Sequence, residues 1–339
     1  MQRRKFLKSA TTLMGTLPFI HINQFNMFNK TFLMDDNVVK MNIGKISCTI
    51  MRDFMFKYMT KDFFINASDE ELNQSLDKYH IIAGNIPSPF IALLLQHDNK
   101  KILIDTGIGF LEKPLIFRGN SYVFEGRLQQ LLQQENIKKE DITDVIITHF
   151  HPDHNGGVFT ENGKLNFPNA QFHMHEDEWS YWHSSQSDNQ PDLFKYFIEK
   201  NISPLKNLNL NLVKGDFVDL LPGITAIKSD GHTPGQISLV IHSESEHLLY
   251  ISDAFLHPLH IEKLDWQTNY DLDHDKAKQS RIKLLEIAHK DNMLVNAFHF
   301  DFPIIFRSCF YLLLILFFCF IVKQIDSDEY IHKKVAIAY

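Results

Sequence analysis

Cysteine is scarce in this sequence. The 339-residue chain has 3 Cys, which are Cys48, Cys309 and Cys319. They form neither a metal-binding pair nor the even, closely spaced set of a disulfide framework. A metal site in this chain would therefore depend on His and carboxylate side chains.

Positive charge is also limited. The chain has 34 Lys and Arg against 41 Asp and Glu, a formal net charge of −7, and no basic stripe marks its central region. Nucleic-acid binding needs such a stripe to neutralise phosphates, so we expect no nucleic-acid partner. Internal repeats and low-complexity linkers are missing too. With 44% hydrophobic residues the chain can form a sizeable core, which predicts one large domain with additions.

The sequence does contain a dense cluster of potential metal ligands. His149, His151, Asp153 and His154 follow the apolar run 144–147, which predicts a buried strand that ends in a loop. Imidazole nitrogens and carboxylate oxygens together favour Zn²⁺, with Mn²⁺, Fe²⁺ and Co²⁺ as alternatives. Two His separated by one residue can reach one ion while the next Asp-His pair points elsewhere. The spacing therefore indicates two ions.

Three later residues extend this cluster. His232 lies in a turn-rich segment before the apolar run 236–241. Asp253 follows the run 248–252, and His299 comes soon after 293–295. Alone, each would be read as an ordinary loop residue. Together with the first cluster, they are expected to complete a metal site at the ends of several strands.

These residues resemble the ligand pattern of the metallo-β-lactamase superfamily. Within it, the chain is most similar to the clade of N-acyl homoserine lactonases and methyl parathion hydrolases, on the segments 104–107, 167–170, 178–179, 257–258 and 265–267. The resemblance implies an α+β fold, an αββα sandwich of two mixed β-sheets flanked by helices. Runs of predicted elements agree with it: strands at 43–52 and 90–104, and helices at 69–79, 126–136 and 275–290.

The resemblance also implies two divalent metal ions. The ligands of one would be His149, His151 and His232. Those of the other would be Asp153, His154 and His299. Asp253 would bridge both ions. A hydroxide between the ions would attack the substrate, because metal coordination lowers the pKa of water to about 7, and Asp153 would be the catalytic residue that carries a proton to the leaving group.

The leading functional hypothesis is a metal-dependent hydrolase that opens lactones of the acyl homoserine type. An aryl phosphotriester hydrolase is the nearest alternative, and thioesters and β-lactams stay open as substrates. An alternative of another class is an inactive, membrane-attached metal-binding protein with a disrupted C-terminus. The partner is expected to be a small-molecule ester, lactone or phosphotriester, and a homodimer is a family expectation.

Several other residues have candidate roles. Asp105, at the end of a predicted strand, is expected to orient a ligand imidazole. The segment 178–203 is expected to cover the cleft, and aromatic side chains are candidates for either a pocket wall or core packing: Phe172, Trp179, Tyr181 and Trp182. Histidines close to the site in sequence but not assigned to it are His257 and His260. Histidines interpreted as surface or structural are His173, His175 and His183.

The two ends of the chain differ from the hydrolase pattern. Arg3 and Arg4, followed by Phe-Leu-Lys and an apolar stretch, resemble a twin-arginine export signal. An ordinary basic N-terminus is the alternative. We therefore expect a signal and linker at 1–35, a hydrolase domain at 36–303, and an exported, periplasmic protein.

The C-terminal tail, residues 304–339, begins with an apolar run that reaches residue 322. That run is about long enough to cross a bilayer. Three interpretations compete: a membrane anchor, an altered ending, or a buried core element. We favour the altered ending, because Phe302 and Pro303 match a family motif that Ile304 breaks.

Overall fold

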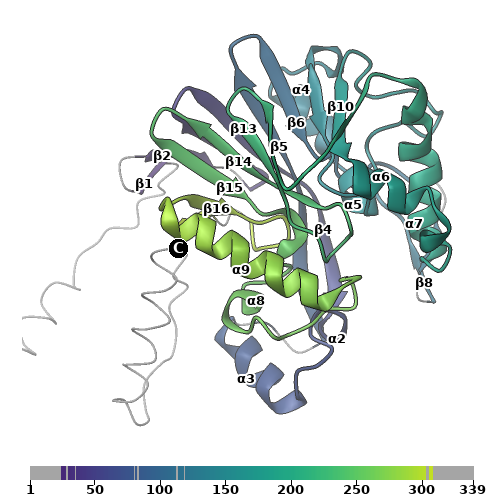
Figure 1. The fold of residues 1–339 in the computed structure, drawn as a ribbon, viewed down its shortest axis with the longest axis vertical. Coiled ribbons are helices and arrows are strands. Elements are labelled where there is room, and N and C mark those ends of the chain that lie inside the picture. The colour runs from purple at the N-terminus through teal and green to yellow at the C-terminus, as the bar shows by residue number, and fades with distance from the viewer. Residues whose placement is uncertain are drawn as a thin grey trace, which may run out of the picture.

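Two β-sheets packed face to face form the centre of the molecule, with helices on both outer sides (Figure 1). The computed structural model describes residues 24–307, apart from 28, 29, 35, 80, 82, 83, 112, 113, 118, 303 and 304. Both sheets mix parallel and antiparallel pairs. The expected αββα sandwich is therefore confirmed.

The first sheet has nine strands in the order β1-β2-β3-β4-β5-β6-β9-β10-β11. Their bounds are β1 Gln24–Met27, β2 Lys30–Met34, β3 Val38–Ile43, β4 Ile46–Met59, β5 Asn85–His97, β6 Lys100–Ile104, β9 Asp144–Ile146, β10 Gln171–His175 and β11 Leu210–Val213. A separate hairpin consists of β7 Leu115–Phe117 and β8 Asn120–Tyr122. Strands β6, β9, β10 and β11 run parallel to one another, so their carboxyl ends meet at one edge.

The second sheet has six strands in sequence order. They are β12 Phe217–Leu221, β13 Ile224–Lys228, β14 Ile237–Ser243, β15 Glu246–Tyr250, β16 Leu294–Asn296 and β17 Ile305–Arg307. Strand β16 pairs parallel with β15, and β17 returns antiparallel beside β16.

The helices are short except for two. They are α2 Thr60–Phe63, α3 Asp69–Lys78, α4 Leu128–Gln134, α5 Pro152–Asn155, α6 Glu176–Trp182, α7 Asp192–Phe197, α8 Leu259–Glu262 and α9 His274–Lys290. Single turns of other helix types are η1 Lys139–Asp141, η2 Ser185–Ser187, η3 Ile198–Ile202, η4 Ser203–Asn207 and η5 Ser252–Ala254. Side-chain caps begin the longer ones: Ser68 accepts from the backbone of Glu71 in α3, and Asp273 from Lys276 in α9.

Three layers of apolar side chains hold the sandwich together. The layer between the sheets includes Ile50 and Leu95 from the first sheet and Leu239 from the second. A second layer packs the first sheet against α4, where Leu128, Leu131 and Leu132 lie on one buried face. A third joins the second sheet to α9, which crosses that sheet in Figure 1. The helices predicted at 69–79, 126–136 and 275–290 are confirmed within a few residues.

The sheets extend beyond both boundaries expected for the hydrolase domain. Strands β1 and β2 precede residue 36, and β2 pairs with β3. Strand β17 follows residue 303, with Ile305 and Phe306 buried. Residues 305–307 of the apolar run 304–322 are therefore part of the second sheet. The twin-arginine segment and residues 308–339 lie outside the described residues.

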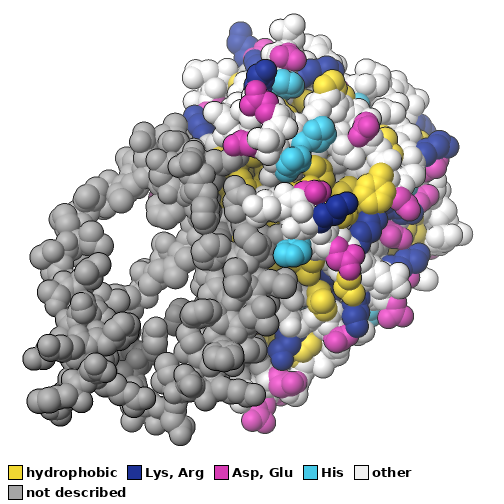
Figure 2. Space-filling model, turned by 60° about the vertical axis from the view of Figure 1, so that its left-hand side comes forward, with side chains coloured by type: hydrophobic (Ala, Val, Ile, Leu, Met, Phe, Trp, Pro, Cys, Tyr) yellow, Lys and Arg dark blue, Asp and Glu magenta, His cyan; other side chains and the backbone are white. Residues whose placement is uncertain are grey.

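On the face shown in Figure 2, acidic and basic side chains are interspersed, and Lys and Arg do not gather into one patch. Among the helices that the structure describes, none combines the length and apolar character needed to span a membrane.

Candidate metal centre

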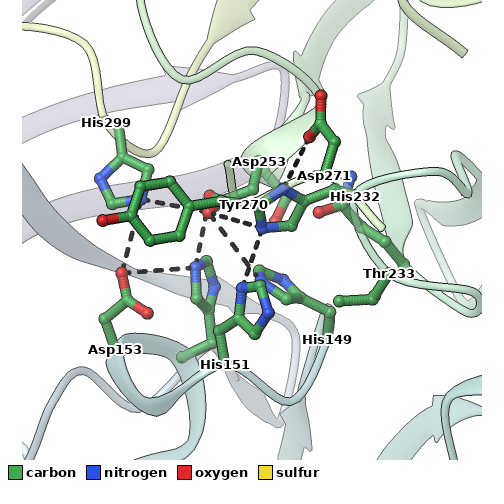
Figure 3. A network of polar contacts seen from close by, with 12 residues as sticks. His149, His151, Asp153, His232, Thr233, Asp253, Tyr270, Asp271 and His299 are labelled. Atoms are coloured by element: carbon green, nitrogen blue, oxygen red, sulfur yellow. Dashed lines mark hydrogen bonds and ion pairs between the residues drawn. The ribbon is translucent and has the colours of Figure 1, made fainter. Parts of the chain in front are cut away.

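The His149–His154 motif lies where β9 ends at the edge of the first sheet. Residues 147–151 form a loop, and Pro152 then begins α5 at a position where its missing N–H costs nothing. The loop supplies His149 and His151 to one group of potential ligands, and the helix supplies Asp153 and His154 to another. Figure 3 shows Asp153, His149 and His151 along the same side of the site.

The later candidates come from the second sheet, which faces this motif. His232 lies in the loop between β13 and β14, Asp253 lies in η5 directly after β15, and His299 follows β16. All seven candidate ligands are buried, with exposed fractions of 6% or less. The structure therefore brings together every residue that the sequence predicted for the metal site.

The candidate ligands divide into two groups that share Asp253. The first is His149, His151, His232 and Asp253. The second is Asp153, His154, Asp253 and His299. Within each group, one ligand atom per residue lies within 4.8 Å of all the others. In Figure 3 the contacts converge on Asp253, whose carboxylate oxygens lie 3.1 Å from Nε2 of His299 and 3.3 Å from Nε2 of His154.

Unpaired polar atoms at this centre fit metal ligation. The buried atoms without a hydrogen-bond partner include Nε2 of His149, Nε2 of His154, Oδ2 of Asp153 and Oδ1 of Asp253. Each such atom costs about 1–3 kcal/mol when it is left unsatisfied. Metal cations held by the two groups would satisfy these atoms, since imidazole and carboxylate are donors found in zinc sites.

Buried partners fix the orientation of three candidate imidazoles. Nδ1 of His154 lies 2.9 Å from Oδ2 of Asp105, as expected for that aspartate. Nδ1 of His299 lies 2.9 Å from Oγ of Ser88. Nδ1 of His232 lies 3.0 Å from Oδ1 of Asp271. A partner on one ring nitrogen leaves the other free for a metal and fixes the tautomer.

Glu178 connects the two loops that carry the first group, a role the sequence did not reveal. Its carboxylate accepts hydrogen bonds from the backbone N–H of Phe150 at 2.9 Å and from Trp182 Nε1 at 2.7 Å. It also accepts from Thr233 Oγ1 at 2.6 Å and from the N–H of Gly235 at 3.0 Å. Phe150 lies between two candidate ligands, and Thr233 follows a third. The sequence singled out Glu178 only as part of the segment 178–179 that carries the family resemblance, without a role.

The electrostatics of the centre suit both imidazole and carboxylate ligands. Burial, together with neighbouring imidazoles, holds the pKa of His149 and His151 well below the usual value, so both rings are neutral. Burial alone would lower the pKa of His154, but the nearby carboxylates outweigh it and raise the pKa. Burial likewise opposes ionisation of Asp253, yet His299 and His154 hold its pKa well below the ordinary value.

An aromatic pocket opens onto the centre. Its lining combines Asp153, Asp253, His151, His232 and His299 with apolar and aromatic side chains: Phe56, Tyr58, Phe63, Phe90, Ile108, Tyr122, Phe124, Pro152, Leu193, Phe194, Leu256 and Tyr270. Among the described residues, no Lys or Arg side chain lines this pocket.

Of the two roles left open for the aromatic residues of this region, the structure shows packing for Phe172, Trp179 and Trp182. Phe172 is buried in the layer between the first sheet and its helices, since it points to that face of β10. Trp179 stacks on His183, with ring centroids 4.1 Å apart, and Trp182 donates to Glu178. The segment 178–203 does reach the pocket, but through Leu193 and Phe194 of α7.

Four further histidines make structural contacts away from the centre. Nε2 of His173 lies 3.0 Å from Oδ1 of Asp144, and His175 caps α6 by accepting from the N–H of Asp177. His257 and His260 are buried beside Phe64, away from the pocket lining. Proximity to Asp253 in sequence did not place them at the centre, because the chain around α8 packs against Phe64 in the cluster around α3.

Comparison with known proteins agrees with this geometry. The model of the metallo-beta-lactamase superfamily matches residues 92–295, and the chain belongs to that superfamily. It is a metal-dependent hydrolase of this family. The matched segment contains six of the candidate ligands, while His299 lies just beyond it.

The relatives include lactonases. The chain is 27% identical to an N-acyl homoserine lactonase of Bacillus cereus over 203 residues, which cover 57% of this chain and 74% of the relative. It is similar to the solved structure of AidC, a dizinc quorum-quenching lactonase in complex with a product, with 27% identity and a TM-score of 0.67 over 80% of this chain and 94% of AidC. The hydrolase AbOPH shares the fold, with 24% identity and a TM-score of 0.68 over 81% of this chain and 94% of AbOPH.

Proposed function

We propose that this protein opens lactone rings of the N-acyl homoserine type with the help of two divalent metal ions. The observation that carries the proposal is the pair of buried ligand groups that share Asp253. The similarity to lactonases of Bacillus and to the dizinc lactonase AidC supports both the substrate class and zinc as the metal.

The residues would divide between the ions as the two groups do. One ion would be held by His149, His151 and His232. The other would be held by Asp153, His154 and His299. Asp253 would bridge them. Zn²⁺ suits this nitrogen and oxygen set best, and Mn²⁺, Fe²⁺ and Co²⁺ are the alternatives. When bound, such a pair of ions supplies hydroxide at neutral pH and polarises a carbonyl oxygen.

Asp153 has the proposed catalytic role of the chain itself. Its Oδ2 atom is buried without a hydrogen-bond partner and lies 3.4 Å from Nε2 of His299, and its side chain lines the pocket. A carboxylate at this position can take the proton from the attacking water and deliver it to the departing ring oxygen. No Ser or Cys nucleophile is needed.

The pocket chemistry supports a neutral substrate with an apolar arm. Aromatic and aliphatic side chains provide most of its wall, and its described lining contains no Lys or Arg to pair with an anionic substrate. An acyl homoserine lactone is neutral and carries a hydrocarbon chain, so it can bury that chain against Phe124 and Phe194.

Aryl phosphotriesters are the second candidate. A flat aromatic leaving group would stack on a wall of this kind, in which the rings of Phe56 and Phe90 already stack with centroids 5.8 Å apart. Hydrolysis of either substrate class would use the same metal ligands. The two classes differ only in the shape and polarity that the pocket must accept.

We also propose that the protein is exported to the periplasm, on the resemblance of the Arg3–Arg4 segment to a twin-arginine signal. Membrane association through residues 308–339 and a homodimer are further proposals. Fractionation of cells that express the full chain, with Arg3 and Arg4 both replaced by Lys as the comparison, tests export.

The decisive experiment measures hydrolysis of an acyl homoserine lactone and an aryl phosphotriester by metal-reconstituted protein. The matched variants are His154→Ala, which removes a proposed ligand, and His289→Ala, which removes an exposed imidazole at the end of α9. We expect lactone turnover that a chelator and His154→Ala abolish and that His289→Ala leaves unchanged. Folded, metal-loaded protein without turnover would favour an inactive metal-binding protein.

A further inference from the structure

Strand β4 brings a tyrosine, Tyr58, to the metal centre. Side chains alternate along its second half, so Phe54, Phe56 and Tyr58 lie on one side while Met55 and Met59 are exposed on the other. The aromatic side faces the pocket, and Tyr58 is the last of the three. The strand predicted at 43–52 stopped short of these residues.

Packing holds the ring of Tyr58 beside the second ligand group. The ring stacks on Phe63 with centroids 4.8 Å apart and meets Tyr270 edge-on at 5.3 Å. It also meets the ring of His299 edge-on, with centroids 5.6 Å apart. A side chain restrained on several faces presents its hydroxyl in a fixed place, which is what a preorganised donor requires.

The hydroxyl of Tyr58 makes no hydrogen bond to any residue that the structure describes. The buried Tyr250, by contrast, donates its hydroxyl to Asp105 at 3.0 Å. Polar groups at the wall of an apolar pocket usually have a partner, because an unsatisfied one is costly. Tyr58 is half-buried and lines the pocket, so a molecule bound there is the natural acceptor for its proton.

We propose that Tyr58 binds the substrate by donating a hydrogen bond from its hydroxyl to the alcohol oxygen that leaves during ester or lactone hydrolysis. This inference rests on the proposed function. Tyr58 and Asp153 both line the pocket next to His299, so they lie on the side of the centre where the leaving oxygen would receive its proton.

The bond would be stronger in the transition state than in the bound substrate. Negative charge grows on the leaving oxygen as its bond to the acyl carbon breaks, and a fixed donor stabilises that charge. In this role Tyr58 donates a hydrogen bond and keeps its own proton. The proton that completes the alcohol comes from Asp153.

The test compares Tyr58→Phe with the wild type on esters that differ in their leaving group. One substrate is a lactone, whose leaving oxygen is a basic alkoxide. The other is a 4-nitrophenyl ester, whose weakly basic leaving oxygen departs without a hydrogen-bond donor. We expect kcat/KM to fall roughly 100-fold for the lactone. For the nitrophenyl ester, we expect a change of less than about threefold, since little charge on that oxygen needs stabilising.

Tyr181→Phe is the matched control. It removes a phenolic oxygen that accepts from Gln190 outside the pocket lining, so both activities should persist. Metal content and unfolding of each variant are measured alongside. Equal losses on both esters, or no loss on the lactone, would overturn the role of Tyr58.

The two proposals fail in different ways. Wild-type turnover of the lactone tests the proposed function, whereas the ratio between variant and wild type across leaving groups tests Tyr58. If the wild type hydrolyses only phosphotriesters, the same comparison of Tyr58→Phe with the wild type is made on an alkyl and an aryl phosphotriester. A wild type that hydrolyses no ester at all overturns both.

Discussion

Oδ1 of Asp271 lies 3.0 Å from Nδ1 of His232 and holds that imidazole from the side away from the other candidate ligands. Its other carboxylate oxygen accepts from Arg281 at 2.7 Å, and all three side chains are buried. A carboxylate behind a ligating imidazole fixes the tautomer and raises its basicity as a ligand. Arg281, on α9, thereby connects the outer helix of the second sheet to the first ligand group.

The variant Asp271→Asn should weaken metal binding without unfolding the protein. Because an amide cannot carry the negative charge that supports His232, we expect the affinity of one of two ions to fall 10- to 100-fold. Competition with a chromogenic chelator measures it. The control is Asp265→Asn, which removes an exposed partner of Lys278. Unchanged affinity at both sites would show that the Asp271 contact does not support a ligand.

The variant Glu178→Gln should lower stability more than a typical polar substitution. Four donors meet the buried carboxylate, and an amide NH₂ would face at least one of them. We expect a loss of about 1–3 kcal/mol in the free energy of unfolding, together with weaker binding of one ion. Urea unfolding measures the first effect. Glu286→Gln, at an exposed position of α9, serves as the control, and equal stabilities would refute the prediction.

Asp53 should make stability depend on pH. Burial raises the pKa of its carboxyl to about 6, although backbone N–H groups of Ile108 and Leu128 and the charge of Arg127 oppose this. The folded state then binds a proton more tightly than the unfolded state, where the pKa is about 3.8. Stability therefore falls as the pH rises from about 4 to about 6, by roughly 2–3 kcal/mol from this group.

Urea unfolding of the wild type and Asp53→Asn across that pH range measures the effect. The variant lacks the titrating group, so the difference between the two stability curves should change with pH over this window. Parallel curves would contradict the prediction. A lower stability of the variant at every pH would not contradict it, because an amide replaces only part of the contacts to Ile108 and Leu128.

Phe194 should set the preference for the acyl chain. Its half-buried ring lies 4.7 Å from the ring of His151 and forms part of the pocket wall. The variant Phe194→Ala removes apolar contact area, so we expect KM to rise more for long-chain than for short-chain lactones, by about 1 kcal/mol or more in binding energy. Tyr196→Ala, at an exposed position of the same helix, is the control. An equal rise at every chain length would contradict this role.

The sequence predicted the ligands because their signal is local. His149 to His154 fall within one loop, and His232, Asp253 and His299 each lie next to an apolar run that ends at the centre. The pocket wall has no such signal. Tyr58 and Phe194 come from a strand and a helix more than a hundred residues apart, and only the fold brings them together. For the same reason the sequence left two roles open for Trp179 and Trp182, since an aromatic residue near the site in sequence packs equally well into the core.

The turn that carries His299 is closed by β17, where Ile305 pairs with Asn296 of β16. Six candidate ligands are synthesised before this turn, but the seventh is fixed only when residues 305–307 join the sheet. During synthesis the first ligand group is complete well before the second. If each group binds an ion, as proposed, the second group would be complete only after β17 has joined the sheet, so a chain that lacks residues 305–307 should keep the first ligand group while His299 lacks its closing strand.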